Sequence, residues 1–378
     1  MFLLFINLSD YTGVKYIRLH MLLMYQGNNL AIRKQIFEAF ERGEKKIEEM
    51  GFYPSTWYQF FDFKRDPFKM SPLDPLERRK DLDLFVNRTA ELEEIAEFIG
   101  MTKKASHSFN LAIIGAEGIG KRSIVRVVNA FALEKGYKGM IYNVDKDEVI
   151  YPEDYERPPV MGPPEERWNY IVFEDPKPVE RVKSYVRKFL GNPTLIISFW
   201  TPEQLVDLEF DRELYIPPLK SDEIQDMILL RIKNAGGKKE RISEDALELI
   251  AKNSLGVPKL GLKLARYSFE LAFRKRKEVV DLDDVKEAST RFGYETRREI
   301  VLTTKEKEIV RFLLKKRYLS PPELADEASI DRVIAWKYLE RLKEKGLLEK
   351  EYRGKTSYFR LREALAVKLQ LELYPKRA

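Results

Sequence analysis

A glycine-rich stretch, GAEGIGKRS at residues 115–123, has the residue types and spacing of a phosphate-binding loop. In such a loop, backbone N–H groups and a helix N-terminus converge on phosphate, glycines let the main chain come close, and a lysine reaches the outer phosphates. The residues that match are Gly115, Gly118, Gly120 and Lys121, between the apolar run LAII and a helical pattern. We therefore predict a P-loop that binds ATP or ADP.

The residue after the lysine departs from this pattern. A Ser or Thr hydroxyl normally stands there and ligates Mg²⁺, but here it is Arg122, and a guanidinium cannot ligate a cation. Ser123 comes one residue later, about 100° further around the helix, so we expect its hydroxyl to point elsewhere. Direct Mg²⁺ ligation from the loop is then lost or passes through water. Arg122 and Ser123 stay candidates for nucleotide contact, and Ser123 for the metal.

A pair of carboxylates, Glu174 and Asp175, ends the apolar stretch YIVFED. At this place P-loop ATPases normally carry Asp for the Mg²⁺ shell and then Glu to orient the attacking water, and here the order is reversed. Glu174 is the candidate to bind the metal through a water molecule. Asp175 is the candidate catalytic base, and its side chain is one methylene shorter than the usual Glu. Because such steps depend on geometry at the ångström level, the reversal predicts weak catalysis. The alternative is a carboxylate pair that merely caps a strand.

The composition excludes several kinds of site. The chain has no cysteine and two histidines, which excludes disulfides, thiolate metal sites and a cysteine nucleophile, and disfavours a histidine-based site. Charged residues make up 34%, with only six glutamines, a profile similar to that of hyperthermophile proteins. Two apolar bursts near the N-terminus are each too short for a membrane span and do not fit a signal peptide. We expect a cytoplasmic protein without membrane contact.

The elements around the loop predict an α/β fold. FNLAIIG, GMIYNVD, RWNYIVFEDP and NPTLIISFW read as apolar strands that alternate with helical patterns, which indicates a parallel sheet covered on both faces. The chain then becomes helical to about residue 296, with Ser243 and Asp281 as cap candidates. Before the sheet, residues 52–81 are rich in proline and aromatics and read as an irregular segment that packs over the next domain.

Residues 84 to 296 resemble an AAA+ ATPase of the origin-recognition initiator group of archaea. FVNRTAELEEI is similar to the adenine-side segment before the P-loop, YIPPLKSDEI to the entry of the helical lid, and SLGVPKLGLKLAR to the lid helix that presents Gly-x-Pro-Arg to the phosphates. The resemblance implies a polar sensor at Ser198 or Thr201, a lid cation at Lys259 in place of arginine, and an arginine finger at Arg212. It also implies self-association through the AAA+ domain.

Three positions depart from that family in chemistry: Arg122, the Glu174–Asp175 pair and Lys259. We therefore expect nucleotide binding with slow or absent hydrolysis. The predicted domains are an N-terminal arm or helical segment of unknown role (1–83), an AAA+ core (84–216), a helical lid (217–298) and a winged helix-turn-helix (299–378).

The last segment carries the charge excess of the chain. Residues 301–378 hold 19 Lys and Arg against 12 Asp and Glu, whereas the whole chain has a net charge of +6. The pattern predicts a helix, the short helix PPELADEA, a longer helix over 331–345, and two strands over 347–352 and 356–361 joined by RGK. This order resembles a winged helix-turn-helix, whose second motif helix enters the DNA major groove.

The cations of this segment are the candidate DNA contacts. On the longer helix, an inner apolar stripe is predicted at Val333, Ile334, Tyr338, Leu339 and Leu342. This leaves Arg332, Lys337 and Arg341 outside as contacts to duplex DNA, with Arg353 and Lys355 at the wing tip beside a phosphate. Trp336 is either a groove contact or packed. The alternative for the whole domain is a winged helix that contacts protein.

Three functions remain open from the sequence. The first is an ATP-controlled, initiator-like DNA-binding protein in which nucleotide sets the angle between the AAA+ body and the winged helix. The second is a P-loop switch that regulates transcription. The third is a nucleotide-loaded assembly scaffold with little or no DNA role.

Overall fold

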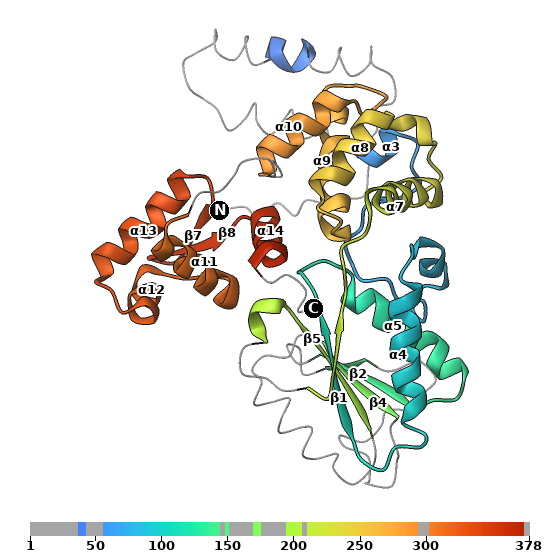
Figure 1. The fold of residues 1–378 in the computed structure, drawn as a ribbon. Coiled ribbons are helices and arrows are strands. Elements are labelled where there is room, and N and C mark those ends of the chain that lie inside the picture. The colour runs from blue at the N-terminus through green and yellow to red at the C-terminus, as the bar shows by residue number, and fades with distance from the viewer. Residues whose placement is uncertain are drawn as a thin grey trace, which may run out of the picture. The chain divides into compact units, whose positions relative to one another are not determined.

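The computed structural model describes residues 37–42, 56–143, 148–150, 169–174, 194–205, 210–293 and 302–373 (Figure 1). Residues 56–378 form one compact unit, and residues 1–55 form another. Among the described residues no helix is long and apolar enough to cross a membrane.

A six-stranded sheet forms the centre of the predicted AAA+ core, residues 84–216. Its strands are β1 (Phe109–Ile114), β2 (Gly139–Asn143), β3 (Glu148–Ile150), β4 (Tyr170–Glu174), β5 (Leu195–Trp200) and β6 (Arg212–Tyr215). They lie in the order β3-β2-β4-β5-β1-β6, and every pairing is parallel except that between β2 and β3. Strands β4 and β5 are buried along their whole length, which explains their continuous apolar sequence. The predicted α/β fold with a parallel sheet is confirmed, and β3 adds an antiparallel edge strand.

Helix α5 (Lys121–Glu134) contacts β2 of this sheet, and α4 (Thr89–Met101) packs against α5. Helix α5 follows β1 through the glycine loop and buries an apolar face that includes Ile124 and Val128. Helix α4 begins at Thr89, and its N-cap residue is Arg88.

The described part of the predicted lid contains the helices α7 (Ser221–Asn234), α8 (Glu244–Asn253), α9 (Pro258–Arg274) and α10 (Leu282–Phe292). The predicted caps are present, because Ser243 accepts from Ala246 N–H and the side chain of Asp281 accepts from two backbone N–H groups of α10. The described part of the aromatic segment packs here as expected: α3 (Trp57–Phe60) contacts α9, and Trp57 and Phe61 surround Phe269.

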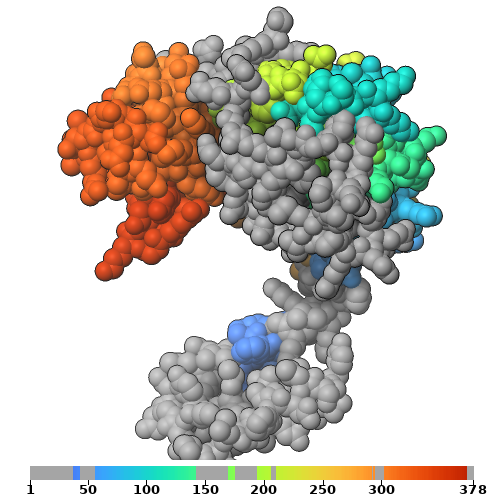
Figure 2. All heavy atoms as spheres, turned by 90° about the horizontal axis from the view of Figure 1, so that it is seen from below, coloured from blue at the N-terminus to red at the C-terminus, as the bar shows by residue number. Residues whose placement is uncertain are grey.

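The C-terminal domain has the element order predicted for a winged helix-turn-helix. It contains α11 (Thr304–Lys316), α12 (Pro321–Ala328), α13 (Arg332–Glu344), β7 (Leu348–Arg353) and β8 (Thr356–Leu361). The two strands pair antiparallel, and the turn includes Gly354 at a φ of 62°. In Figure 2 the residues from α11 onward, orange to red, gather into one body. A further helix, α14 (Glu363–Leu373), follows the hairpin and was not expected from the sequence.

The predicted inner stripe of α13 is wrong at two positions. Val333 is 60% exposed and Ile334 46%, whereas Ala335, Leu339 and Leu342 are fully buried. The buried positions follow the spacing i, i+4, i+7 of one helical face, and residues 333 and 334 fall 200° and 100° away from residue 335. The outer face of this helix therefore presents apolar as well as basic side chains.

Candidate nucleotide-binding site and C-terminal interface

The glycine loop lies between β1 and the first residue of α5, as a P-loop requires. Gly118 and Gly120 take φ angles of 81° and 107°, in the left-handed region that glycine adopts without strain. Lys121 is the first helical residue, so the N-terminus of a 14-residue helix adjoins the loop. Helix dipoles and unpaired N–H groups favour anions at such an end.

A cavity of about 410 Å³ opens over this loop. Its lining includes the predicted residues Gly118, Gly120, Lys121, Arg122, Ser123, Thr201 and Lys259. The sequence thus identified residues from the loop, from just after β5 and from the predicted lid that the fold brings to one place. Gly115 lies just behind, where its carbonyl accepts from the Lys121 ammonium. Of the two sensor candidates, Ser198 is instead held within its own strand, since its Oγ accepts from Trp200 Nε1 at 2.7 Å.

The Lys121 ammonium is folded onto the loop itself. It donates to Gly115 O at 2.5 Å and to Ala116 O at 3.1 Å. Burial lowers the pKa of Lys121 to about 8, partly offset by the carboxylates of Glu203 and Glu117. An anionic phosphate in the cavity would stabilise the charged form of this lysine.

The hydroxyl of Ser123 and the carboxylate of Glu174 are both engaged within the protein. Ser123 Oγ accepts from Leu73 N–H at 3.1 Å. Glu174, 1% exposed, receives two bonds of 2.9 Å from Arg126, whose remaining nitrogen pairs with Asp74 at 2.9 Å. A metal at Glu174 would compete with a guanidinium for the same two oxygens, so these residues do not fit direct Mg²⁺ ligation. Asp175 lies outside the described residues, among which no cluster of three or more metal-ligand side chains occurs.

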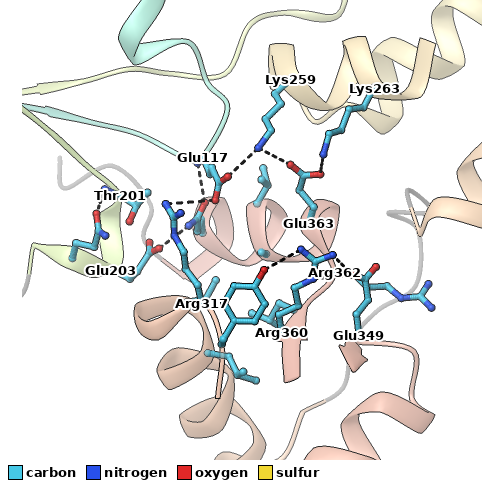
Figure 3. A pocket seen from close by; sticks show the side chains of 18 of the residues that line it. Glu117, Thr201, Glu203, Lys259, Lys263, Arg317, Glu349, Arg360, Arg362 and Glu363 are labelled. Atoms are coloured by element: carbon cyan, nitrogen blue, oxygen red, sulfur yellow. Dashed lines mark hydrogen bonds and ion pairs between the residues drawn. The ribbon is translucent and has the colours of Figure 1, made fainter. Parts of the chain in front are cut away.

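The lid closes directly on the loop. Lys259 N–H donates to Gly118 O at 3.3 Å, and a Cβ on Gly118 would lie 2.5 Å from that of Lys259. The Lys259 ammonium is held between Glu117 at 2.9 Å and Glu363 at 2.8 Å (Figure 3). The predicted lid cation is therefore beside the loop, paired with two carboxylates that sequence reasoning did not single out.

Two further residues at the site were missed from the sequence. Arg231 of α7 lines the cavity at 8% exposure, and burial lowers its pKa to about 10. Its Nε is buried and has no hydrogen-bond partner among the described residues. Glu203, 4% exposed just after β5, has a pKa raised by burial. Neither position has a local spacing signal, because its role comes from long-range packing.

The predicted DNA contacts gather on α13 and the hairpin. All five side chains, Arg332, Lys337, Arg341, Arg353 and Lys355, are exposed. The Arg353 guanidinium lies 4.3 Å from the Tyr318 ring centre and pairs with Glu351 at 2.6 Å. Apolar side chains stand among these cations, with Trp336 46% and Tyr352 70% exposed.

Comparison with known proteins gives distant similarities. No family model matches the chain. It is 23% identical to an uncharacterized HTH-type transcriptional regulator of Methanocaldococcus jannaschii, over 80% of this chain and 91% of that protein. Among solved structures, the Aeropyrum pernix ORC1 protein in complex with DNA gives a TM-score of 0.45 at 17% identity, over 80% of this chain and 96% of its own. The Thermotoga maritima RuvB Holliday junction branch migration motor gives 0.41 at 14% identity, over 80% and 98%.

Proposed function

We propose that this chain binds ATP or ADP in its P-loop, binds duplex DNA through its C-terminal winged helix-turn-helix, and hydrolyses ATP slowly or not at all. One observation carries the proposal: a phosphate-type loop enclosed by a basic lid belongs to the same compact unit as a helix and hairpin with exposed cations. Initiator-like control of DNA binding by nucleotide is the function that joins these two parts.

The phosphate groups of a nucleotide fit the cavity. The loop offers its N–H groups, the N-terminus of α5 and the Lys121 ammonium as donors. The guanidinium of Arg231, which lines the cavity from α7, adds a positive charge. Mg²⁺ would arrive with the nucleotide, held mainly by phosphate oxygens and water. Since Arg126 already occupies both oxygens of Glu174, the arrangement favours holding a nucleotide over splitting it.

The test of the nucleotide site is binding of fluorescent ADP and ATP to the full chain. Lys121→Ala should weaken binding by at least about tenfold, because it removes a charge-assisted bond to phosphate. Lys252→Ala, at an exposed position of α8, is the matched control and should bind like the wild type. Equal affinity for Lys121→Ala and the control would contradict the site.

Turnover is tested separately, as Mg²⁺-dependent phosphate release with and without duplex DNA near the working temperature. We expect release close to background in both conditions. Turnover that rises with DNA would show that Arg122 and the paired Glu174 are tolerated, and the protein would then be a cycling ATPase.

A switch-type transcription regulator is the second candidate. The Methanocaldococcus relative named as an HTH-type regulator aligns with 80% of this chain. An initiator-like protein should distort bound duplex, measured as a rise in 2-aminopurine fluorescence, whereas a regulator should bind without it. The third candidate, an assembly scaffold, requires weak duplex binding.

Self-association through the AAA+ domain is tested by sedimentation with nucleotide, and Arg212→Ala at its exposed position should weaken it.

A further inference from the structure

Helix α14 belongs to two hydrophobic cores at once. Ala364 and Val367, 3% and 2% exposed, pack in the core that contains the sheet and the lid. Leu369, 5% exposed, packs in the core of the C-terminal domain. Any movement of this helix therefore changes how both domains are packed.

Gln370 of this helix binds the phosphate loop. It is 4% exposed, its Oε1 accepts from Glu117 N–H at 3.1 Å, and its Nε2 donates to Glu203 at 2.6 Å. Backbone N–H groups of a P-loop are the donors that hold phosphate. In this structure one of them is satisfied by a side chain from the other end of the sequence.

Glu363, at the first turn of α14, binds the lid cation. Its carboxylate pairs with Lys259 at 2.8 Å and also with Lys263 of the same lid helix (Figure 3). Arg317, just after α11, reaches Glu117 at 3.9 Å from another side. The C-terminal domain thus contacts the loop and the lid through three charged or polar side chains.

We propose that α14 is a latch on the phosphate loop, so that nucleotide phosphate and Gln370 with Glu363 compete for the Glu117 N–H and the Lys259 ammonium. The inference rests on the proposed nucleotide binding. A phosphate group that takes these donors removes the Glu117 partner of the buried Gln370 and one of the two lysine partners of Glu363. Both losses favour release of α14. Release would uncouple the two cores and free the C-terminal domain to reorient on DNA.

The first test compares nucleotide affinity of full-length variants. Gln370→Ala and Glu363→Gln should each bind fluorescent ADP more tightly, on the order of tenfold for Glu363→Gln, because an internal competitor for a charged donor is removed. Glu372→Gln is the matched control: it makes the same charge change on the same helix, at a residue whose side chain is 56% exposed. The control should bind like the wild type.

Equal affinities for all forms would overturn the latch and leave nucleotide binding standing. Weaker binding by Gln370→Ala would also overturn it, since Gln370 would then help to hold the nucleotide. No binding by any form, wild type included, would overturn nucleotide binding and the latch together.

A second measurement needs no variant. In the wild type, saturating ADP should speed hydrogen exchange at the backbone amides of residues 363–373 and leave those of the buried strand β5 protected. Unchanged protection of α14 at saturating ADP would overturn the latch even if the variants failed to fold.

Discussion

The cavity over the glycine loop and the C-terminal surface are both rich in cations, but their cations are held differently. At the cavity, Lys259 is paired with two carboxylates, and behind it on α5 Arg126 is paired with Glu174 and Asp74. On the C-terminal domain, side chains such as Lys337 and Lys355 stand exposed. A ligand at the cavity must displace partners inside the protein, whereas a ligand on the outer surface displaces water and counterions.

Because of this difference, substitutions in the two regions should affect different properties of the protein. Breaking a buried pair leaves an uncompensated charge and costs folding free energy. Changing an exposed cation leaves the fold almost unchanged and alters binding and its salt dependence. A substitution near the cavity should therefore change the free energy of unfolding, whereas one on the outer surface should change binding and its salt dependence.

The largest effect is expected on stability at the buried pair. Arg126→Ala leaves Glu174 buried without its two bonds, so the free energy of unfolding should fall by about 3–5 kcal/mol. Arg332→Ala, at an exposed position of α13, should change it by no more than about 0.5 kcal/mol. Urea unfolding followed by tryptophan fluorescence measures both, and equal transitions would show that Arg126 is held as loosely as the surface cations.

The second effect concerns duplex binding at the wing. The double change of Arg353 and Lys355 to Glu should weaken binding roughly 10- to 100-fold and reduce the slope of log affinity against log salt by about two. A matched control reverses Lys238 and Lys239 to Glu, which gives the same net charge at an exposed edge of the lid. Fluorescence anisotropy across a salt series measures both variants. If the control weakens binding as much as the wing variant, overall charge rather than the wing governs binding.

Local patterns account for what the sequence predicted. Short stretches of glycines, cap residues and regularly spaced apolar residues specify the P-loop and the order of elements in the winged helix. The predicted bounds of the hairpin strands therefore lie within one residue of the observed ones, and Lys121 lies where the P-loop pattern predicts it. Even Lys259, some 140 residues from the loop, was found because the lid has its own motif.

Partners set by packing could not be predicted in this way. Gln370 meets Glu117 across 253 positions of sequence, and Arg126 meets Asp74 across 52. No spacing rule connects such residues, because their meeting depends on how whole elements pack. The phase of α13 was misjudged for a related reason: the core side of a helix is set by its neighbours, and the apolar residues Val333 and Ile334 turned out exposed.

The third prediction concerns pH at the cavity. In the free protein the pKa of Lys121 is lowered to about 8 by burial, and bound phosphate favours the protonated form. Above pH 8 binding must therefore take up a proton, so nucleotide affinity should fall about tenfold between pH 7 and pH 9. Lys121→Arg stays charged across this range and should show a nearly flat profile. The same decline in both proteins would mean that Lys121 is not the titrating group.

The smallest effect concerns base contacts by the outer face of α13. Residues in the N-terminal half of a recognition helix meet base edges, and apolar side chains there contact the methyl group of thymine. Val333, 60% exposed, is placed for such a contact. In a duplex selected for tight binding, replacing a contacted thymine with deoxyuridine should cost the wild type about fourfold in affinity, the value of one buried methyl group.

Val333→Ala makes this test specific. The variant should lose the same factor on the thymine duplex and then be indifferent to deoxyuridine, because the methyl group has lost its partner. A wild type that is indifferent to deoxyuridine at every position would instead assign the exposed apolar face of α13 to a protein partner. In that case the cations of the domain would hold DNA by its phosphates alone, and the exposed apolar side chains of α13 would bind a protein.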